Sequence, residues 1–205
     1  MDVSLFLRGL VIGFSVAAPV GPIGVLCIRR TLVDGQMAGL VSGLGAATAD
    51  ALYGCVAAFG LTFISGFLIG QKLWLSLIGG LFLLYLGIKT LLSRPAEEAA
   101  KAEETGLLGA YLSTFLLTLT NPMTILSFVA IFAALGLGST TSNSYASALT
   151  LVLGVFCGSA FWWLLLSGGV GLFRNRFNPK GLLWVNRISG AVITLFGIIA
   201  LGGLL

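Results

Sequence analysis

A single carboxylate stands in the middle of an apolar segment. Between Arg30 and Lys72 the only charged residues are Asp34 and Asp50, and Asp50 lies about halfway along the apolar stretch from 36 to 64. An aspartate at the centre of a membrane helix costs about 2.5 to 3.5 kcal/mol on insertion scales, so its presence indicates a role or a partner. A buried carboxylate can exchange a proton or pair with an ammonium group. It can also be only a hydrogen-bonded packing residue.

Prolines interrupt two other apolar segments at positions one hundred residues apart. Pro22 follows Gly21 in APVGP, and Pro122 follows Asn121 in TNP, each inside a stretch that otherwise has helical character. Proline lacks a backbone N–H, so a carbonyl one turn earlier loses its helical partner. Hydrocarbon cannot satisfy such groups, and paired breaks of this kind are the best sequence indication of a transporter site. A kink kept only for packing is the alternative.

These features together predict one polar site at membrane depth. The first helical turn after each proline offers N–H groups to a carboxylate, with Asn121 placed to cap the second turn. Freed carbonyls and Asp50 suit an ammonium or small cation, so a zwitterion fits the mixture. The expected site residues are Asp50, then Gly21, Pro22, Ile23, Gly24, Asn121, Pro122, Met123 and Thr124 around the breaks, and the carbonyls of Ser15, Ala18 and Thr118.

Two arginines and several aromatic residues are secondary candidates. Arg29 and Arg30 either anchor the topology or, if the helix from Pro22 continues to Gly35, lie in a vestibule where they attract an anionic group. Tyr53 and Trp162, with Trp163, are candidates to line the path, although membrane aromatics commonly fill packing gaps or interfacial belts.

The composition defines the elements that must position these residues. Of the 205 residues, 58% are hydrophobic and 9% are charged, which excludes a soluble globular domain. Six apolar stretches are each near the ~20 residues needed to cross a bilayer. The sequence predicts an all-α polytopic membrane protein with spans at about 3–28, 36–64, 73–92, 107–135, 146–170 and 182–205. The first stretch is interpreted as a helix and not a signal peptide, because no basic region precedes it.

The basic residues report topology and do not form a nucleic-acid surface. Most of them lie in or beside the first, third and fifth loops, which places these loops in the cytoplasm and both termini on the periplasmic or extracellular side. These nine residues are Arg29, Arg30, Lys89, Arg94, Lys101, Arg174, Arg176, Lys180 and Arg187, against Arg8 and Lys72 on the other side.

A polar segment divides the chain into two halves. Residues 93–106 form the expected cytoplasmic linker, between a first three-helix repeat (1–92) and a second (107–205) within one membrane domain. Because three is odd, the two repeats must be inverted, with broken first and fourth helices. With a small insertion, Gly45, Asp50 and Tyr53 align with Gly154, Ser159 and Trp162.

These motifs resemble those of the lysine exporter (LysE/RhtB) family. The resemblance rests on AAPVGP followed by Arg29-Arg30, on Gly39-x3-Gly43 leading to Asp50, and on TNP at 120–122, and it covers the whole chain. It implies export of amino acids or close derivatives across the bacterial inner membrane. The resemblance also implies that the protein is not an enzyme but a proton-driven antiporter without a cofactor, and a homo-oligomer, with a dimer favoured. The single deep acid favours a neutral amino acid, of the homoserine or threonine type.

Three other functions are open alternatives. A cation or metal exporter of the same superfamily is one, although the chain has no His and its cysteines, Cys27, Cys55 and Cys157, are scattered. A membrane thiol-electron carrier is another, and it requires paired reactive cysteines. A structural subunit without transport is the third.

Overall fold

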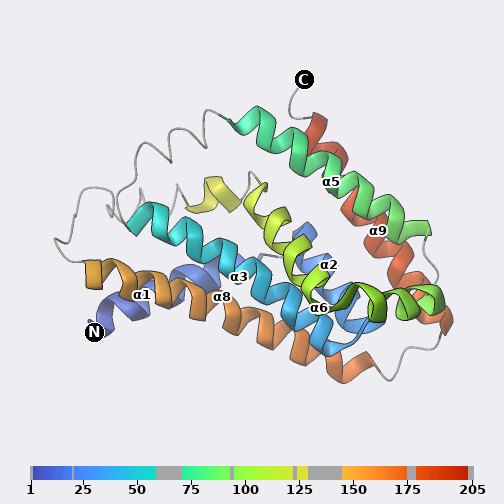
Figure 1. Ribbon diagram of the computed structural model, residues 1–205, viewed down its shortest axis with the longest axis horizontal. Helices are drawn as coiled ribbons and strands as arrows, with labels where there is room; N and C mark the ends of the chain where they lie inside the picture. Colours follow the sequence, from blue (N-terminus) through green and yellow to red (C-terminus); the bar gives the residue numbers. More distant parts are fainter. Residues whose placement is uncertain are drawn as a thin grey trace.

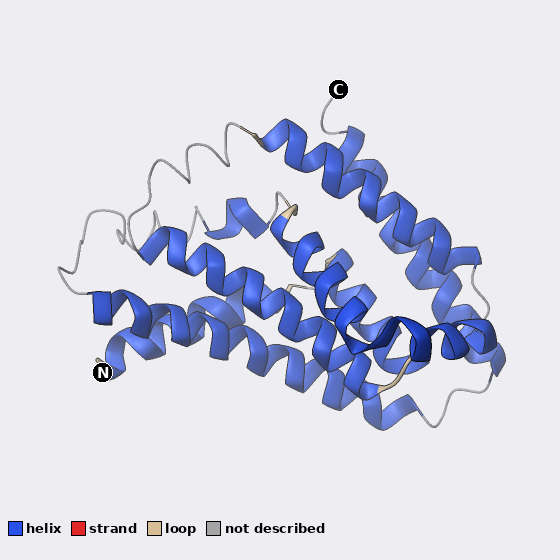
Figure 2. Cartoon of the chain, viewed as in Figure 1, coloured by secondary structure: helices blue, strands red, loops and turns tan. Residues whose placement is uncertain are grey.

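The described part of the chain is entirely helical. The computed structural model describes residues 2–19, 21–58, 71–92, 95–121, 124–128, 145–174 and 179–202. The helices within these ranges are α1 (Val3–Ala17), α2 (Pro22–Val33), α3 (Gln36–Ala58), α5 (Lys72–Leu92), α6 (Pro95–Leu119), α8 (Tyr145–Phe173) and α9 (Pro179–Gly202). Figure 2 shows that all described elements are helices joined by loops.

Four of these helices are long and apolar enough to cross a membrane, namely α3, α5, α8 and α9, and α1 with α2 make a fifth span if the bent pair is counted as one. The all-α membrane architecture is therefore confirmed. The predicted fourth span (107–135) is described only as far as 121 and again over 124–128, so six spans and their inverted arrangement stay predictions.

The first span is broken where its prolines lie. α1 and α2 meet at an angle of 81°. Pro22 occupies the first turn of α2, with Gly21 at the N-cap in an extended conformation. This is the favoured place for a proline, because its missing N–H would have no intrahelical acceptor there. At the other end, α2 continues past Ile28 to Val33, and Gly35 has a φ of 110°, a backbone conformation that favours glycine.

The segment expected to be a linker contains a helix. α6 begins at Pro95, and Gly106, with a φ of 63°, interrupts the helical geometry before the apolar part continues to Leu119. The first part is rich in Glu and Ala, which are good helix formers, and this explains why a polar segment is helical.

Glycines set the closest helix contacts. A Cβ added at Gly154 on α8 would come within 2.9 Å of Gly9 Cα on α1, and one at Gly197 on α9 within 2.9 Å of Leu84 N on α5. The helices α1 and α8 lie side by side, as do α5 and α9 (Figure 1). Small residues at these positions let the backbones touch, which is how helices commonly associate in a bilayer.

Candidate functional site

Asp50 is buried at the contact between α3 and α8. Its side chain is 3% exposed, and its Oδ2 accepts a hydrogen bond of 2.7 Å from the Ser159 hydroxyl. The Ser159 oxygen in turn accepts one of 3.2 Å from the Trp163 indole N–H. The result is a buried relay from an aromatic N–H through a hydroxyl to a carboxylate.

The second carboxyl oxygen of Asp50 makes no hydrogen bond in the described part of the chain. Within that part, Ser167 Oγ is the only fully buried side-chain polar atom without a hydrogen-bond partner. Oδ1 of Asp50 is therefore both unpaired and reachable. One oxygen is held by Ser159 and the other is open to a proton or to a ligand donor.

The first break packs one turn before Asp50. Ala17 and Ile23, which flank the break, share a buried cluster with Ala46 and Ala47 of α3 and with Trp163. In α2, which starts at Pro22, the N–H groups of the buried residues Ile23 and Gly24 lie in the first turn, where no intrahelical acceptor exists. These donors lie on the helix next to the relay.

The second break is tied to α3 through Tyr53. The Tyr53 hydroxyl donates a 2.6 Å hydrogen bond to the carbonyl of Leu119, the last residue of α6. Its ring lies 5.6 Å from that of Phe128, beyond the break. Tyr53 thus contacts both sides of the interruption, one turn after Asp50 in α3.

At the second break, the hydrogen bonding of the Thr118 carbonyl differs from the prediction. Thr118 was expected to present a free carbonyl, but that carbonyl accepts a 3.2 Å bond from the Asn121 N–H, because the helix tightens into a turn at its end. The carbonyl of Asn121 accepts a 3.1 Å bond from the Thr124 N–H, which lies in the next described helical segment. Pro122 and Met123 lie outside the described residues.

The Ser15 and Ala18 carbonyls expected at the first break stay predictions. The side chain of Ser15 is exposed and Ala18 is half-buried, whereas the carbonyl of Pro19 accepts a 3.0 Å bond from the Gly21 N–H. Ser15 thus lies on the face of α1 that points away from the core. The chain leaves the helix through a tight turn, which the sequence pattern did not indicate.

Arg29 is buried and not a simple surface anchor. Its Nε donates a 3.0 Å bond to Asn186 Oδ1 on α9, and its Nη1 lies 3.6 Å from Asp34 Oδ2. Burial raises the pKa of the Asp34 carboxyl, while the neighbouring Arg29 and Arg30 oppose this rise. Arg29 therefore links α2 to α9, a contact that sequence spacing could not predict.

Arg30 points the other way, toward α3 and α6. Its guanidinium donates to four neutral oxygens, at 2.8 to 2.9 Å. These are Ser42 Oγ, the Ala110 carbonyl, Thr114 Oγ1 and Ser113 Oγ. Arg174, at the end of α8, donates to the carbonyls of Leu32 and Val33 at the end of α2. Three arginines thus gather at one end of the molecule.

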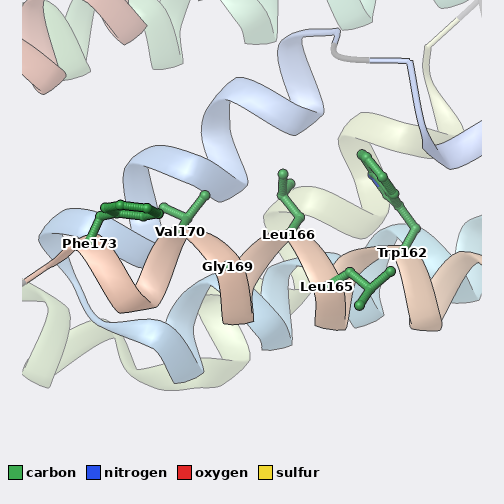
Figure 3. Close-up of a pocket in the computed structure, with 6 residues that line it drawn as sticks. All are labelled: Trp162, Leu165, Leu166, Gly169, Val170 and Phe173. Atoms are coloured by element: carbon green, nitrogen blue, oxygen red, sulfur yellow. The ribbon is translucent and has the colours of Figure 1, made fainter.

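Trp162 is not part of the Asp50 relay. Its neighbour Trp163 donates the hydrogen bond to Ser159 instead. Trp162 meets Phe14 edge-on, with ring centroids 5.4 Å apart. It also lines an apolar hollow of about 300 Å³ along α8, together with Leu165, Leu166, Gly169, Val170 and Phe173 (Figure 3). An apolar lining does not suit a zwitterion, because its charges would lose hydration without gaining partners.

A helical membrane bundle with a buried acid between two broken segments is typical of membrane transport proteins. Residues 14–202 match the family model of the LysE type translocators. The chain therefore belongs to the LysE translocator family, as its motifs predicted.

Two curated relatives are similar to the chain over most of its length. The chain is 29% identical over 197 residues to the "Putative amino acid efflux protein YcgF" of Bacillus subtilis (strain 168), covering 95% of this chain and 93% of that protein. It is 24% identical over 179 residues to the uncharacterized membrane protein YahN of Escherichia coli (strain K12), covering 83% and 77%. No solved structure matches the chain.

Proposed function

We propose that this translocator exports neutral amino acids from the cytoplasm by proton antiport, with Asp50 used in turn by proton and substrate. The observation that carries the proposal is the state of the Asp50 carboxyl: buried, held by Ser159 through one oxygen, and open at the other. A membrane carboxylate in this state can bind either a proton or an ammonium, but not both at once.

The donors of the first break supply the complementary charge. The N–H groups of Ile23 and Gly24 in the first turn of α2 suit a substrate carboxylate, and the positive end of the helix dipole adds to their attraction. A substrate with a further positive charge would need a second deep acid. The described spans hold Asp50 alone in that position, which favours a neutral amino acid over lysine or arginine.

Alternating access by two inverted repeats is the mechanism that we infer. Three aligned pairs support it. Gly45 packs on the backbone of Tyr111 in α6, as Gly154 packs on the backbone around Phe6 and Gly9 in α1. The other two aligned pairs, Asp50 with Ser159 and Tyr53 with Trp162, also make equivalent contacts in the two halves.

A residue of the first repeat contacts the second repeat where its aligned counterpart contacts the first. Tyr53 bonds Leu119 at the end of α6, and its counterpart Trp162 contacts Phe14 near the end of α1. Asp50 and its counterpart Ser159 contact each other. Equivalent residues touch one another only near a two-fold axis, so the relay lies close to the axis that would relate the two repeats.

Counterflow in proteoliposomes tests the export function. Vesicles loaded with one unlabelled amino acid are assayed for uptake of the same labelled amino acid, across a panel of neutral, basic and acidic side chains. We expect accumulation for neutral members, and faster efflux when an inward proton gradient is imposed. A protein that moves none of the panel, or whose efflux ignores the gradient, would contradict the proposal.

An exchange of Asp50 and Ser159 tests the repeat. Asp50→Ser and Ser159→Asp should each lower gradient-driven efflux strongly, because one loses the acid and the other places two acids together. The double variant keeps one acid and one hydroxyl across the same contact, and we expect it to regain part of the efflux. A double variant no better than Asp50→Ser would show that the two positions are not interchangeable.

A further inference from the structure

We infer that Arg30 forms a separate entry site that captures the carboxylate of the exported amino acid before it reaches Asp50. The inference rests on the proposed function and adds a second binding position on the path. It starts from the unusual surroundings of the Arg30 guanidinium, which is half-buried and bonded only to neutral oxygens.

The charge of Arg30 lacks a direct counterion among the described side chains. Asp34, whose charge also acts on Arg30, makes its ion pair with Arg29, and Arg174 adds a third positive charge beside the end of α2. A cation withdrawn from water is stabilised best by an opposite charge, and neutral oxygens compensate it only in part. This end of the described structure therefore favours an anion.

The guanidinium has donors left over to receive that anion. Three of the four bonds are made by Nη1, which has only two hydrogens to share among Ser42, Ala110 and Thr114, and Nη2 makes one bond, to Ser113. Nε and the second Nη2 hydrogen have no acceptor in the described part of the chain. In the described part of the chain, Ser167 Oγ is the only fully buried side-chain polar atom without a hydrogen-bond partner, so the Nε atom of Arg30 is not fully buried. It can therefore be reached.

The geometry of these donors selects a carboxylate. The Nε and Nη2 hydrogens of an arginine point in parallel and match the two oxygens of a carboxylate. The hydroxyls around Arg30 already donate to carbonyls of their own helices: Ser42 to Ala38, Ser113 to Gly109 and Thr114 to Ala110. Their positions are thus fixed, which keeps the guanidinium in one orientation.

The distance along α3 separates this position from the Asp50 site. Ser42, which contacts Arg30, precedes Asp50 by eight residues, or about 12 Å at 1.5 Å per helical residue. The carboxylate and ammonium of one amino acid are too close together to bridge that span. A substrate can occupy Arg30 first and Asp50 afterwards, and Arg30 lies at the end where the first and third loops meet, the end predicted to face the cytoplasm.

The test compares a transported amino acid with its amino alcohol, in which the carboxylate is replaced by a hydroxymethyl group. Binding of both is measured for the purified wild type, for Arg30→Gln and for Arg30→Lys. We expect Arg30→Gln to weaken amino-acid binding about tenfold or more, the loss of one charged pair, and to leave amino-alcohol binding unchanged. Arg30→Lys keeps the charge but not the two parallel donors. Its affinity for the amino acid should lie between those of the wild type and Arg30→Gln.

Thermal stability in detergent separates this role from a purely structural one. If Arg30 only fastens α2 to α3 and α6, Arg30→Gln will weaken both ligands equally and lower the unfolding temperature, and the inference is overturned. Ser167→Ala, on α8, is the matched control for a buried polar change and should leave both affinities unaltered. A wild type that moves no amino acid in counterflow would instead overturn the proposed function, and the entry site with it.

Discussion

Replacing Asp50 by Asn is expected to lower gradient-driven efflux by about 100-fold, as is typical when a positioned proton-transfer group is removed. Asn has nearly the same shape, and its amide oxygen can still accept the bond from Ser159. The side chain cannot, however, alternate between a charged and a neutral form. The variant should therefore insert and fold but lose coupling, as measured by efflux from proteoliposomes with and without an imposed pH gradient.

The ratio of coupled to uncoupled transport is the informative quantity in that experiment. Ser167→Ala serves as the control, since it changes another buried polar side chain on the helix that faces Asp50. If Asp50→Asn transports as well as the wild type and responds equally to the gradient, Asp50 has no part in the mechanism. Loss of folded protein in both variants would point to a general packing effect.

Gly158→Leu is expected to have the largest effect on stability. A Cβ at Gly158 would overlap the Leu10 carbonyl and lie 2.9 Å from Phe14 N, both in the backbone of α1. Backbone atoms cannot turn aside as side chains can, so the helices must separate. We expect a loss of about 3 kcal/mol in the free energy of unfolding, at the upper end of overpacking costs, measured by denaturant titration in mixed micelles.

Gly169→Leu is the matched control on the same helix. Nothing lies within 4 Å of a Cβ at Gly169, which borders the apolar hollow. This substitution should change the free energy of unfolding by less than about 1 kcal/mol, because it adds apolar atoms without displacing any. Equal losses at the two positions would mean that the contact with α1 is not what makes Gly158 sensitive.

The sequence predicted the features that follow from local chemistry. Pro22 had to start a helix because of its missing N–H, and it does. Asp50 was expected to be buried, since it lies halfway along an apolar stretch, and it is. Both conclusions need only the helical period and the cost of polar groups in lipid.

Features that depend on tertiary contacts could not be predicted in this way. The bonds of Arg29 to Asn186 and of Arg30 to Ser113 join residues far apart in the chain, and neither has a local signal. The Thr118 carbonyl was expected to be free because Pro122 has no N–H, but it accepts a hydrogen bond from the Asn121 N–H. Ser159 appeared only as the aligned counterpart of Asp50, and its hydrogen bond with Asp50 required the structure.

The glycine contacts between α1 and α8 limit how this protein can change shape. Where backbones touch, no long side chains lie between the helices that could adopt new rotamers and let one helix slide along the other. α1 and α8 should then travel as one rigid unit, and so should α5 and α9. Relative movement is left to the short α2, which meets α1 at a sharp angle and is fastened at its far end by exchangeable arginine bonds.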